Sequence, residues 1–341
     1  MFKPKYAISP RLLNNIKRIA VLVADLNQRS FPETILLEME RRANAESTYS
    51  STSIEGNPLP LTAVKQILKN HPDHIRSTEQ EVINYNQALE YLKKIPKSKK
   101  LLDMDLILQI HKLVMNKLIS KNNLAKFRQE PVFVNNPKTR RTIYWPPDHC
   151  DVKSLVLELI TYINQNRSVI DPLILSGIFH KQFVIIHPFI DGNGRSTRLL
   201  TKHLLANLGL NTFNLFSFEN YYNQNVSKYF QKVGIQGNYY DVKDSIDFTE
   251  WLEYFTDGIV DELLRVTKEL ETLSVNPETE LNIYHKKIIK YIENHGYIND
   301  KLYSELTDRA KATRSLDLKK LCSLGIIEKQ GRGRATYYRL R

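Results

Sequence analysis

Residues 187–198 read His-Pro-Phe-Ile-Asp-Gly-Asn-Gly-Arg-Ser-Thr-Arg and hold the highest density of chemically capable side chains in the sequence. Gly192 and Gly194 allow successive backbone N–H groups to face inward, and a helix predicted from Arg195 presents its positive end to the same place. This combination is typical of an anion-binding loop. Arg195 and Arg198 share one helix face, so their guanidinium groups can hold the outer phosphates of a nucleotide.

Two further side chains of this loop suit phosphate chemistry. Asp191 offers hard carboxylate oxygens of the kind that Mg²⁺ prefers, usually beside substrate phosphates and waters. His187 lies just outside the predicted cradle, and an imidazole can accept a hydroxyl proton near neutral pH. Single histidines are more often structural, and paired helical arginines often form a solvated face. Together, however, these residues predict a nucleotide site with a metal ligand and a general base.

The elements that must position this loop are predicted to be helices, because apolar residues recur at spacings of three and four through most of the chain. A β-hairpin interrupts them, with strands at 131–134 and 142–145 around a polar turn at 135–138. The chain is therefore predicted to be mainly α. The predicted helices cover residues 33–53, 79–95, 104–118, 152–163, 172–185, 195–208, 220–233 and 248–273.

A separate small domain is predicted after a polar, proline-bearing linker at 274–280. Its predicted order is three helices, at 281–294, 300–306 and 310–324, followed by strands at 326–329 and 335–340. Three helices closed by a basic hairpin resemble a winged helix, in which the last helix reads a groove and the turn with Arg332 and Arg334 is the wing. We expect this α+β domain to span residues 281–341.

The charge of the chain is concentrated in this last domain. Residues 281–341 carry 14 Lys and Arg against six Asp and Glu, which is +8 of the formal +12. Such asymmetry favours DNA or another acidic partner. Winged helices also serve as protein-docking or dimerisation modules, and a solvated basic surface without a ligand is the plainer alternative.

Composition excludes several other classes of protein. The chain is 42% hydrophobic with only 12 Gly and 14 Pro, which is typical of an ordinary globular protein of two or three domains. No apolar run approaches the roughly 18 residues of a membrane span, and the first residues lack the apolar stretch of a signal peptide. Cys150 and Cys322 lie far apart, so neither a disulfide framework nor a zinc module is predicted. We expect a cytoplasmic protein with no membrane partner.

Residues 187–198 resemble the signature of the Fic family, His-Pro-Phe-x-Asp/Glu-Gly-Asn-Gly-Arg-x-x-Arg, at every specified position. Arg128, the hairpin end at 145–147 and the helical segment Gly177-Ile-Phe-His-Lys-Gln-Phe at 177–183 also look like features of the Fic core. The resemblance implies a helical core with a β-hairpin flap. It divides the chain into an N-terminal helical region over 1–78 and a catalytic core with following helices over 79–273.

The resemblance implies a protein adenylyltransferase, which transfers AMP from ATP to a Ser, Thr or Tyr hydroxyl of a target protein, self-modification included. His187 would be the base, Asp191 would bind Mg²⁺, and the flap would take the target segment by strand addition. Asn225 and Phe230 resemble an Asn-x-x-x-Tyr-Tyr helix that lines the base and ribose pocket, although Phe230 lacks the phenol. The other implied ATP-binding residues are Gly192, Asn193, Gly194, Arg195, Ser196 and Arg198.

Glu55 ends an early helix, where the helix dipole favours a cation, so its carboxylate should have a partner elsewhere. Residues 51–56, Ser-Thr-Ser-Ile-Glu-Gly, resemble the inhibitory motif of Fic proteins. By that resemblance Glu55 would pair with Arg198, occupy the place of the γ-phosphate and inhibit the enzyme.

Two alternatives to adenylylation stay open. In one, the chain is a DNA-binding transcriptional regulator whose Fic core only senses nucleotide. In the other, the same signature transfers another phosphate-containing group, such as phosphocholine. Gly194 argues against a phosphotransferring branch that has Lys at this position.

Overall fold

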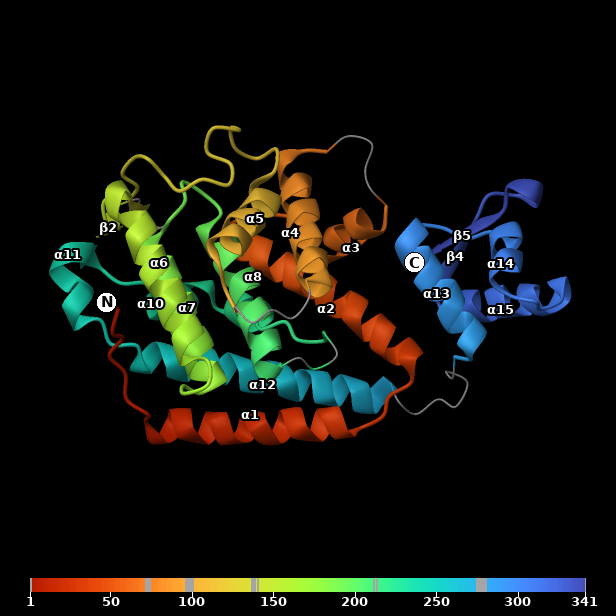
Figure 1. The fold of residues 1–341 in the computed structure, drawn as a ribbon, viewed down its shortest axis with the longest axis horizontal. Coiled ribbons are helices and arrows are strands. Elements are labelled where there is room, and N and C mark those ends of the chain that lie inside the picture. The colour runs from red at the N-terminus through yellow and green to blue at the C-terminus, as the bar shows by residue number, and fades with distance from the viewer. Residues whose placement is uncertain are drawn as a thin grey trace. The chain divides into compact units, whose positions relative to one another are not determined.

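The computed structural model describes residues 2–70, 75–95, 101–135, 139, 141–210, 212, 214–273 and 281–340. The chain divides into two compact units (Figure 1). One comprises Met1–Asn27 with Ala43–Arg265, and the other Gln28–Arg42 with Val266–Arg341. Each is described by itself. The predicted linker, residues 274–280, lies outside the described residues.

Helices dominate the first unit, as the apolar spacing predicts. Short segments Ala206–Leu210 and Lys243–Ser245 add a π-helical and a 3-10 turn. The helices whose residues belong to this unit in whole or in part are α1 (Pro10–Gln28), α2 (Glu33–Ile54), α3 (Leu61–Lys69), α4 (Ser77–Lys94), α5 (Met104–Met115), α6 (His149–Asn166), α7 (Pro172–Ile186), α8 (Asn193–Leu205), α9 (Glu219–Gln224), α10 (Val226–Val233), α11 (Tyr239–Val242) and α12 (Thr249–Leu273).

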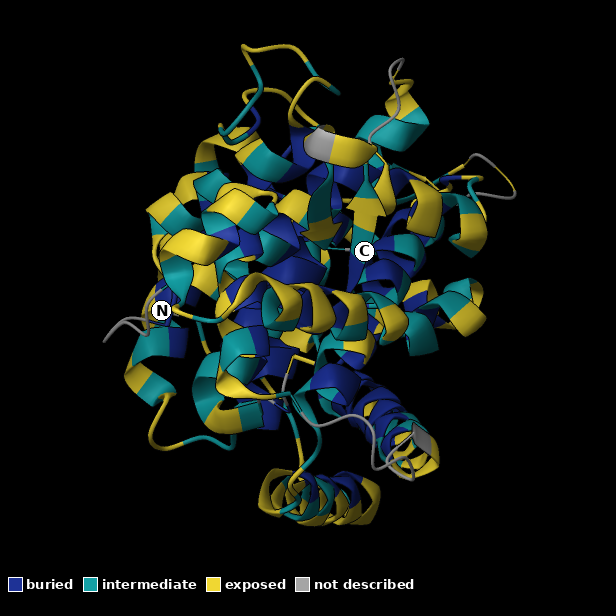
Figure 2. Cartoon of the chain, turned by 90° about the vertical axis from the view of Figure 1, so that its right-hand side faces the viewer, coloured by how far each residue is buried: buried dark blue, intermediate teal, exposed yellow. Residues whose placement is uncertain are grey.

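Helix α7 forms the centre of this unit. Most of its side chains are apolar, and all its residues except Pro172 and Val184 are buried. Pro172 fits its first turn, and the Asp171 carboxylate caps it by accepting a hydrogen bond from the N–H of Leu173 at 2.9 Å. Its apolar side chains join those of α4, α5, α6 and α8 in one core. In Figure 2 the buried residues lie in the interior of the helical assembly, and the exposed residues lie on the outward faces.

The predicted hairpin is present in shortened form. Strand β1 covers only Val134–Asn135, so the expectation of a strand over 131–134 is wrong for its first three residues, and β2 covers Thr142–Trp145 as predicted. These two strands pair antiparallel, while β2 pairs in parallel with β3 (Gly237–Asn238). Residues 136–138 of the predicted turn lie outside the described residues. Strand β3 was not predicted, because two residues are too few to show the alternation of apolar and polar side chains that indicates a strand.

Two other features differ from the expected helix pattern. The helix predicted over 220–233 is broken into α9 and α10 at Asn225, whose backbone leaves the helical region and whose side chain caps α10 by accepting a hydrogen bond from the N–H of Lys228 at 3.0 Å. Helices α1 and α3 were not predicted. Helix α1 runs beside α12 in Figure 1, and its apolar stripe contains a polar residue, Asn15, which donates to Thr256 at 3.1 Å.

The second unit contains the predicted order of three helices and a hairpin. Helices α13 (Ile283–His295), α14 (Asp300–Leu306) and α15 (Lys311–Ser323) precede antiparallel strands β4 (Ile327–Gln330) and β5 (Tyr337–Leu340). They share a core that includes Ile288, Tyr303 and Leu318. The identity of this unit as a winged helix stays a prediction. Among the described residues of the whole chain, no helix combines the length and the apolar character that crossing a bilayer requires.

Candidate active site

The loop before α8 presents the positive end of that helix, as the glycines predict. Gly192 is the N-cap of α8 with a φ of +80°, a conformation that L side chains rarely adopt. A Cβ on Gly192 would also lie 2.6 Å from Met115 Sδ, so a larger residue would require the Met115 side chain to move. The Asn193 side chain closes the loop, because it accepts from the N–H of Phe189 at 2.9 Å and donates to its carbonyl at 2.8 Å.

His187 lies at the other side of this loop, at the C-terminal end of α7. Its backbone is left-handed, with a φ of 51°, so the imidazole turns out of the helix direction. Nδ1 lies 3.3 Å from the carbonyl of Val184, which can only accept, so Nδ1 carries the hydrogen and Nε2 has a free lone pair. Burial lowers the pKa of His187 to about 4. The side chain is therefore a neutral imidazole at pH 7.

Arg128 holds the backbone of His187 in place. Its Nε donates to the His187 carbonyl at 2.9 Å, its Nη2 donates to the carbonyl of Pro147 at 2.5 Å, and its own N–H donates to the carbonyl of Pro188 at 3.0 Å. The guanidinium is buried, and burial lowers its pKa. Arg128 therefore connects the end of the hairpin to His187, a contact that the sequence did not reveal.

His111, which the sequence reasoning missed, supports the same loop from α5. Its Nδ1 accepts from the N–H of Ala125 at 3.1 Å, so Nε2 carries the hydrogen and donates to the carbonyl of Asp191 at 3.1 Å. The ring stacks on Phe189 with centroids 3.8 Å apart. The one signal in the sequence is a histidine among the apolar residues of an amphipathic helix.

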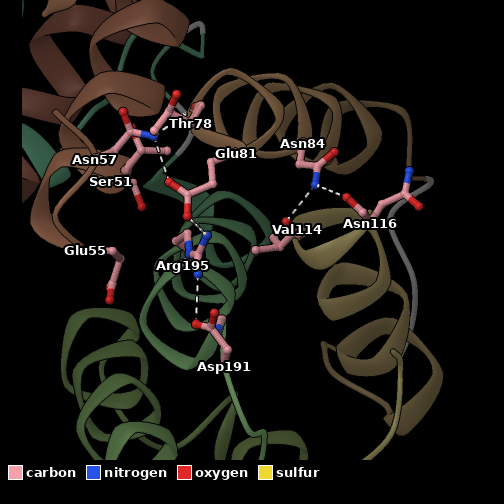
Figure 3. A network of polar contacts seen from close by, with 12 residues as sticks. Ser51, Glu55, Asn57, Thr78, Glu81, Asn84, Val114, Asn116, Asp191 and Arg195 are labelled. Atoms are coloured by element: carbon pink, nitrogen blue, oxygen red, sulfur yellow. Dashed lines mark hydrogen bonds and ion pairs between the residues drawn. The ribbon is translucent and has the colours of Figure 1, made fainter. Parts of the chain in front are cut away.

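Arg195 lies between two carboxylates (Figure 3). Its Nη1 contacts Glu81 Oε1 at 3.0 Å, and its Nη2 contacts Asp191 Oδ1 at 2.9 Å. The second oxygen of Glu81 accepts from Asn57 Nδ2 at 2.7 Å. Glu81 therefore joins the segment after α2 to Arg195, and the sequence reasoning did not identify it.

Asp191 fits the expected metal ligand. Its side chain is 56% exposed, and its Oδ1 accepts from the N–H of Gly192 as well as from Arg195. Among the described residues, no group of three or more His, Cys, Asp or Glu side chains could hold a metal by itself. A single carboxylate beside a phosphate cradle is a donor set that suits Mg²⁺, which usually takes its other ligands from substrate phosphates and water.

Glu55 lies over Gly194 and contacts Arg198, although 143 residues separate the two in sequence. Its Oε1 lies 2.7 Å from Arg198 Nη2, and a Cβ on Gly194 would lie only 2.1 Å from the same oxygen. Ser51, one turn earlier, accepts from Arg198 Nε through its hydroxyl at 2.7 Å and from Nη2 through its carbonyl at 2.9 Å. The expected Glu55–Arg198 contact is present, and its inhibitory role stays a prediction.

Arg198 is fully buried, and burial opposes its charge; the Glu55 carboxylate, together with the nearby Tyr229 and Tyr85, raises the pKa of the guanidinium above its ordinary value. Its Nη1 has no hydrogen-bond partner among the described residues and lies 3.1 Å from the place that a Gly194 Cβ would take. Arg195 Nε is likewise buried without such a partner in that part of the chain. Unpaired donors beside a helix N-terminus are suited to phosphate oxygens.

The remaining predicted residues lie in two places. Ser196 is buried inside α8, and its Oγ has no partner among the described residues. Asn225 is the exposed N-cap of α10, and Phe230, on that helix, is 41% exposed. The structure thus brings Glu55 to the signature loop, whereas no contact joins that loop to Asn225 or Phe230 among the described interactions.

The chain is similar to proteins of one known family. The family model described as Fic/DOC family matches residues 101–205. The protein adenylyltransferase Fic of Drosophila erecta is 26% identical over 216 residues, which are 58% of this chain and 42% of that protein. The chain spans less than half the length of the curated relatives that it matches.

Solved structures share the fold. A Fic family protein from Desulfovibrio desulfuricans G20 superposes with a TM-score of 0.64 at 20% identity, over 100% of this chain and 98% of that one. Fic-1 from C. elegans has a TM-score of 0.60 at 22% identity, over 76% of this chain and 73% of that one. The mainly helical fold predicted from the sequence is confirmed.

Proposed function

Because residues 101–205 of this chain match the Fic/DOC family model, we propose that it is a protein adenylyltransferase that uses Mg²⁺ and ATP. The observation that carries the proposal is the cradle at the start of α8. Arg198 Nη1 lies there beside Gly194, and His187 Nε2, with its lone pair, belongs to the same loop; neither atom has a hydrogen-bond partner among the described residues. A hydroxyl of a target protein would attack the α-phosphorus of ATP, and pyrophosphate would leave.

Each residue of the site has a role in this reaction. His187 Nε2 would take the proton of the attacking hydroxyl, and Arg128 would hold His187 through its carbonyl. The α8 N-terminus would bind phosphate oxygens, with Arg195 and Arg198 on the leaving pyrophosphate. Asp191 would hold Mg²⁺, which supplies charge neutralisation to the phosphates. Catalysis would consist mostly of positioning and charge stabilisation.

Glu55 would act as a brake on this reaction. Its carboxylate lies against Gly194 and on Arg198, where an outer phosphate of ATP would need the same guanidinium. A carboxylate and a phosphate cannot share that place, because both are anions with the same preferred partner. The protein would therefore be inactive until Glu55 moves away.

The test is transfer of label from α-³²P-ATP to protein, with the chain alone and with a lysate from which targets can be captured. His187→Ala should lower transfer by about 10²- to 10⁴-fold while ATP still binds. Transfer by His187→Ala at the wild-type rate would refute the mechanism. Transfer of label from a choline-containing nucleotide, and not from ATP, would favour the phosphocholine alternative.

A second function, DNA binding by the C-terminal unit, is supported by the outward face of α15. Lys311, Ser315 and Lys319 are exposed there, and Leu316 is 64% exposed. The acid of this helix, Asp317, is buried and accepts from Tyr303 at 2.6 Å. The outward face thus carries positive charge without an acid of its own helix, which suits a phosphate backbone.

DNA binding can be tested at the exposed turn between β4 and β5, which contains Arg332. The side chain of Arg334 lies outside what the structure describes. Replacing both by Ala in the full chain should flatten the salt dependence of DNA binding by up to about two phosphate contacts. Absence of DNA affinity at low salt would favour a protein-docking module. DNA binding without AMP transfer would favour the nucleotide-sensing regulator.

A further inference from the structure

Helices α2 and α8 meet beside the phosphate cradle through side chains that recur every fourth residue. Ser47, Ser51 and Glu55 therefore lie along one face of α2, and Arg198 and Lys202 lie along one face of α8. Ser51 and Glu55 both contact Arg198, as described above. One turn away, Lys202 Nζ donates to the hydroxyl of Ser47 at 2.6 Å. The segment that ends in Glu55 thus has a second polar contact with α8, which the proposed reaction does not use.

Lys202 is held in place from the side of the core as well. Its Nζ lies 3.3 Å from Glu219 Oε2, and the Glu219 side chain is fully buried. The other oxygen, Oε1, accepts from the hydroxyl of Tyr85 on α4 at 3.0 Å, and Oε2 accepts from the hydroxyl of Ser217 at 3.4 Å. A buried carboxylate with such partners is fixed, because leaving it unpaired would be costly. We therefore expect Lys202 to keep its place when Ser47 leaves.

The half of α2 that makes these contacts has few apolar side chains to hold it. Between residues 47 and 55 the buried residues are mostly hydroxyl-bearing ones: Ser47, Thr48, Ser50, Ser51 and Thr52, with Ile54. Burial of a Ser or Thr side chain gains much less free energy than burial of a Leu or Ile, because it removes less apolar surface from water. Polar contacts such as those of Ser47 and Ser51 must therefore contribute a large share of what holds this segment against α8.

The contact between Ser47 and Lys202 lies away from the nucleotide site. Lys202 follows Gly194 on α8 at a distance of about 12 Å along the helix axis, as the rise of a helix requires. Its ammonium contacts Ser47 and Glu219, and neither belongs to the phosphate cradle. A change at Ser47 can therefore alter how firmly the segment is held without removing a group that binds ATP.

We propose that Ser47 and Lys202 form a distal latch for the inhibitory segment, residues 51–56: their contact helps to keep Glu55 on Arg198, and its loss releases the inhibition. This inference rests on the proposed function and names a regulatory contact of the same site. It assigns the hold on Glu55 to two places on α8, one at the cradle and one beyond it. The inhibition can then be released from the distal end, where no group that binds ATP takes part.

The experiment compares two Ser→Ala variants of α2. Ser50 is the matched control, because it lies in the same helix, is fully buried like Ser47, and its hydroxyl has no hydrogen-bond partner among the described residues. Both changes alter helix propensity in the same way, so the contact with Lys202 is what distinguishes them. Ser47→Ala should raise AMP transfer from α-³²P-ATP about fivefold, the worth of one net hydrogen bond, and not beyond the rate of Glu55→Gly. Ser50→Ala should leave the rate unchanged.

Two further measurements show whether the effect passes through Glu55. Amide hydrogen exchange, which needs no activity, should become faster over residues 51–56 in Ser47→Ala and not in Ser50→Ala. In the Glu55→Gly background Ser47→Ala should cause no further rise in transfer, because the group that the latch holds is absent.

Three results would overturn the inference: equal transfer by the two Ser→Ala variants, equal exchange over residues 51–56 in both, or an undiminished rise when Ser47→Ala is added to Glu55→Gly. If Glu55→Gly transfers no AMP, the proposed function fails, and hydrogen exchange still decides whether the latch exists. If Glu55→Gly is active and Ser47→Ala behaves like Ser50→Ala, the latch alone fails.

Discussion

Arg195 and Arg198 lie one turn apart on α8, both are buried, and each contacts a carboxylate from the N-terminal part of the chain. The two carboxylates differ in where they come from. Glu81 belongs to α4, a helix whose apolar residues are part of the main core. Glu55 follows the last residue of α2, in the turn with Gly56. Similar ion pairs are thus built on a core helix and on a helix end.

The two acids also differ in how many contacts hold them. Glu81 uses one oxygen for Arg195 at 3.0 Å and the other for Asn57 at 2.7 Å. The Glu55 carboxylate contacts Arg198 through Oε1, and a side chain built on the neighbouring Gly56 would meet nothing within 4 Å. An ion pair can act as a switch only when one partner can leave without opening the core. We expect Glu55, with its single ion pair at a helix end, to meet that condition, and Glu81 to stay with Arg195 during the proposed reaction.

The largest expected effect comes from removing the arginine after the brake has been removed. In the Glu55→Gly background, Arg198→Ala should lower AMP transfer by about 10²-fold, because a positioned donor for transition-state charge is lost. Initial rates with α-³²P-ATP on a captured target measure it. If the double variant transfers as fast as Glu55→Gly alone, Arg198 holds no phosphate, and its ion pair with Glu55 cannot inhibit the enzyme by blocking a phosphate site.

Removing the brake alone should have the next largest effect, with the opposite sign. Glu55→Gly frees the Arg198 guanidinium for phosphate, so transfer should rise about tenfold or more over wild type. Most substitutions lower activity, so a rise in AMP transfer would identify Glu55 as inhibitory. The unfolding curve of the variant is the control for an intact fold. A folded Glu55→Gly protein with wild-type activity in both self-labelling and lysate assays would remove the inhibitory role.

Glu81→Gln should show that the second ion pair is not a brake. The amide keeps the shape of the side chain but removes the charge that holds Arg195, so transfer should fall about fivefold, the worth of one net hydrogen bond. The same change at the other acid, Glu55→Gln, is the matched variant and should raise transfer. A rise with Glu81→Gln would mean that both acids inhibit.

The sequence predicted the loop better than its surroundings. The glycines and the caps of α7 and α8 are local signals, and the pairing of Glu55 with Arg198 followed from a motif. Glu81 and His111 were missed, because their contacts with the loop join residues 114 and 80 positions apart. Such contacts depend on how helices pack, and helix periodicity shows which face is buried but not its partner.

The same limit explains the errors in the fold. The break at Asn225 was missed because the apolar spacing continues through it, although Asn is a favoured N-cap. Strand β3 has two residues and exists only through its pairing with β2. The long helices were predicted because their own periodicity specifies them.

The last and smallest expected effect concerns His111, which supports the loop beside Arg195. His111, which donates to the Asp191 carbonyl, has a pKa lowered to about 4 by burial, with the charge of Arg195 acting in the same direction. The unfolded chain should bind this proton near pH 6.5 and the folded chain only near pH 4. Between these values the unfolded state holds more protons, so the free energy of unfolding should fall as the pH falls.

One such group contributes a slope of at most about 1.4 kcal/mol per pH unit in this window and none above pH 7. His111→Phe keeps a ring to stack on Phe189 and removes the titration, so its unfolding free energy should depend less steeply on pH between 6.5 and 4 than that of wild type. Urea unfolding at several pH values measures both slopes. Equal slopes would mean that His111 titrates alike in the folded and unfolded chains and that burial does not keep its ring neutral.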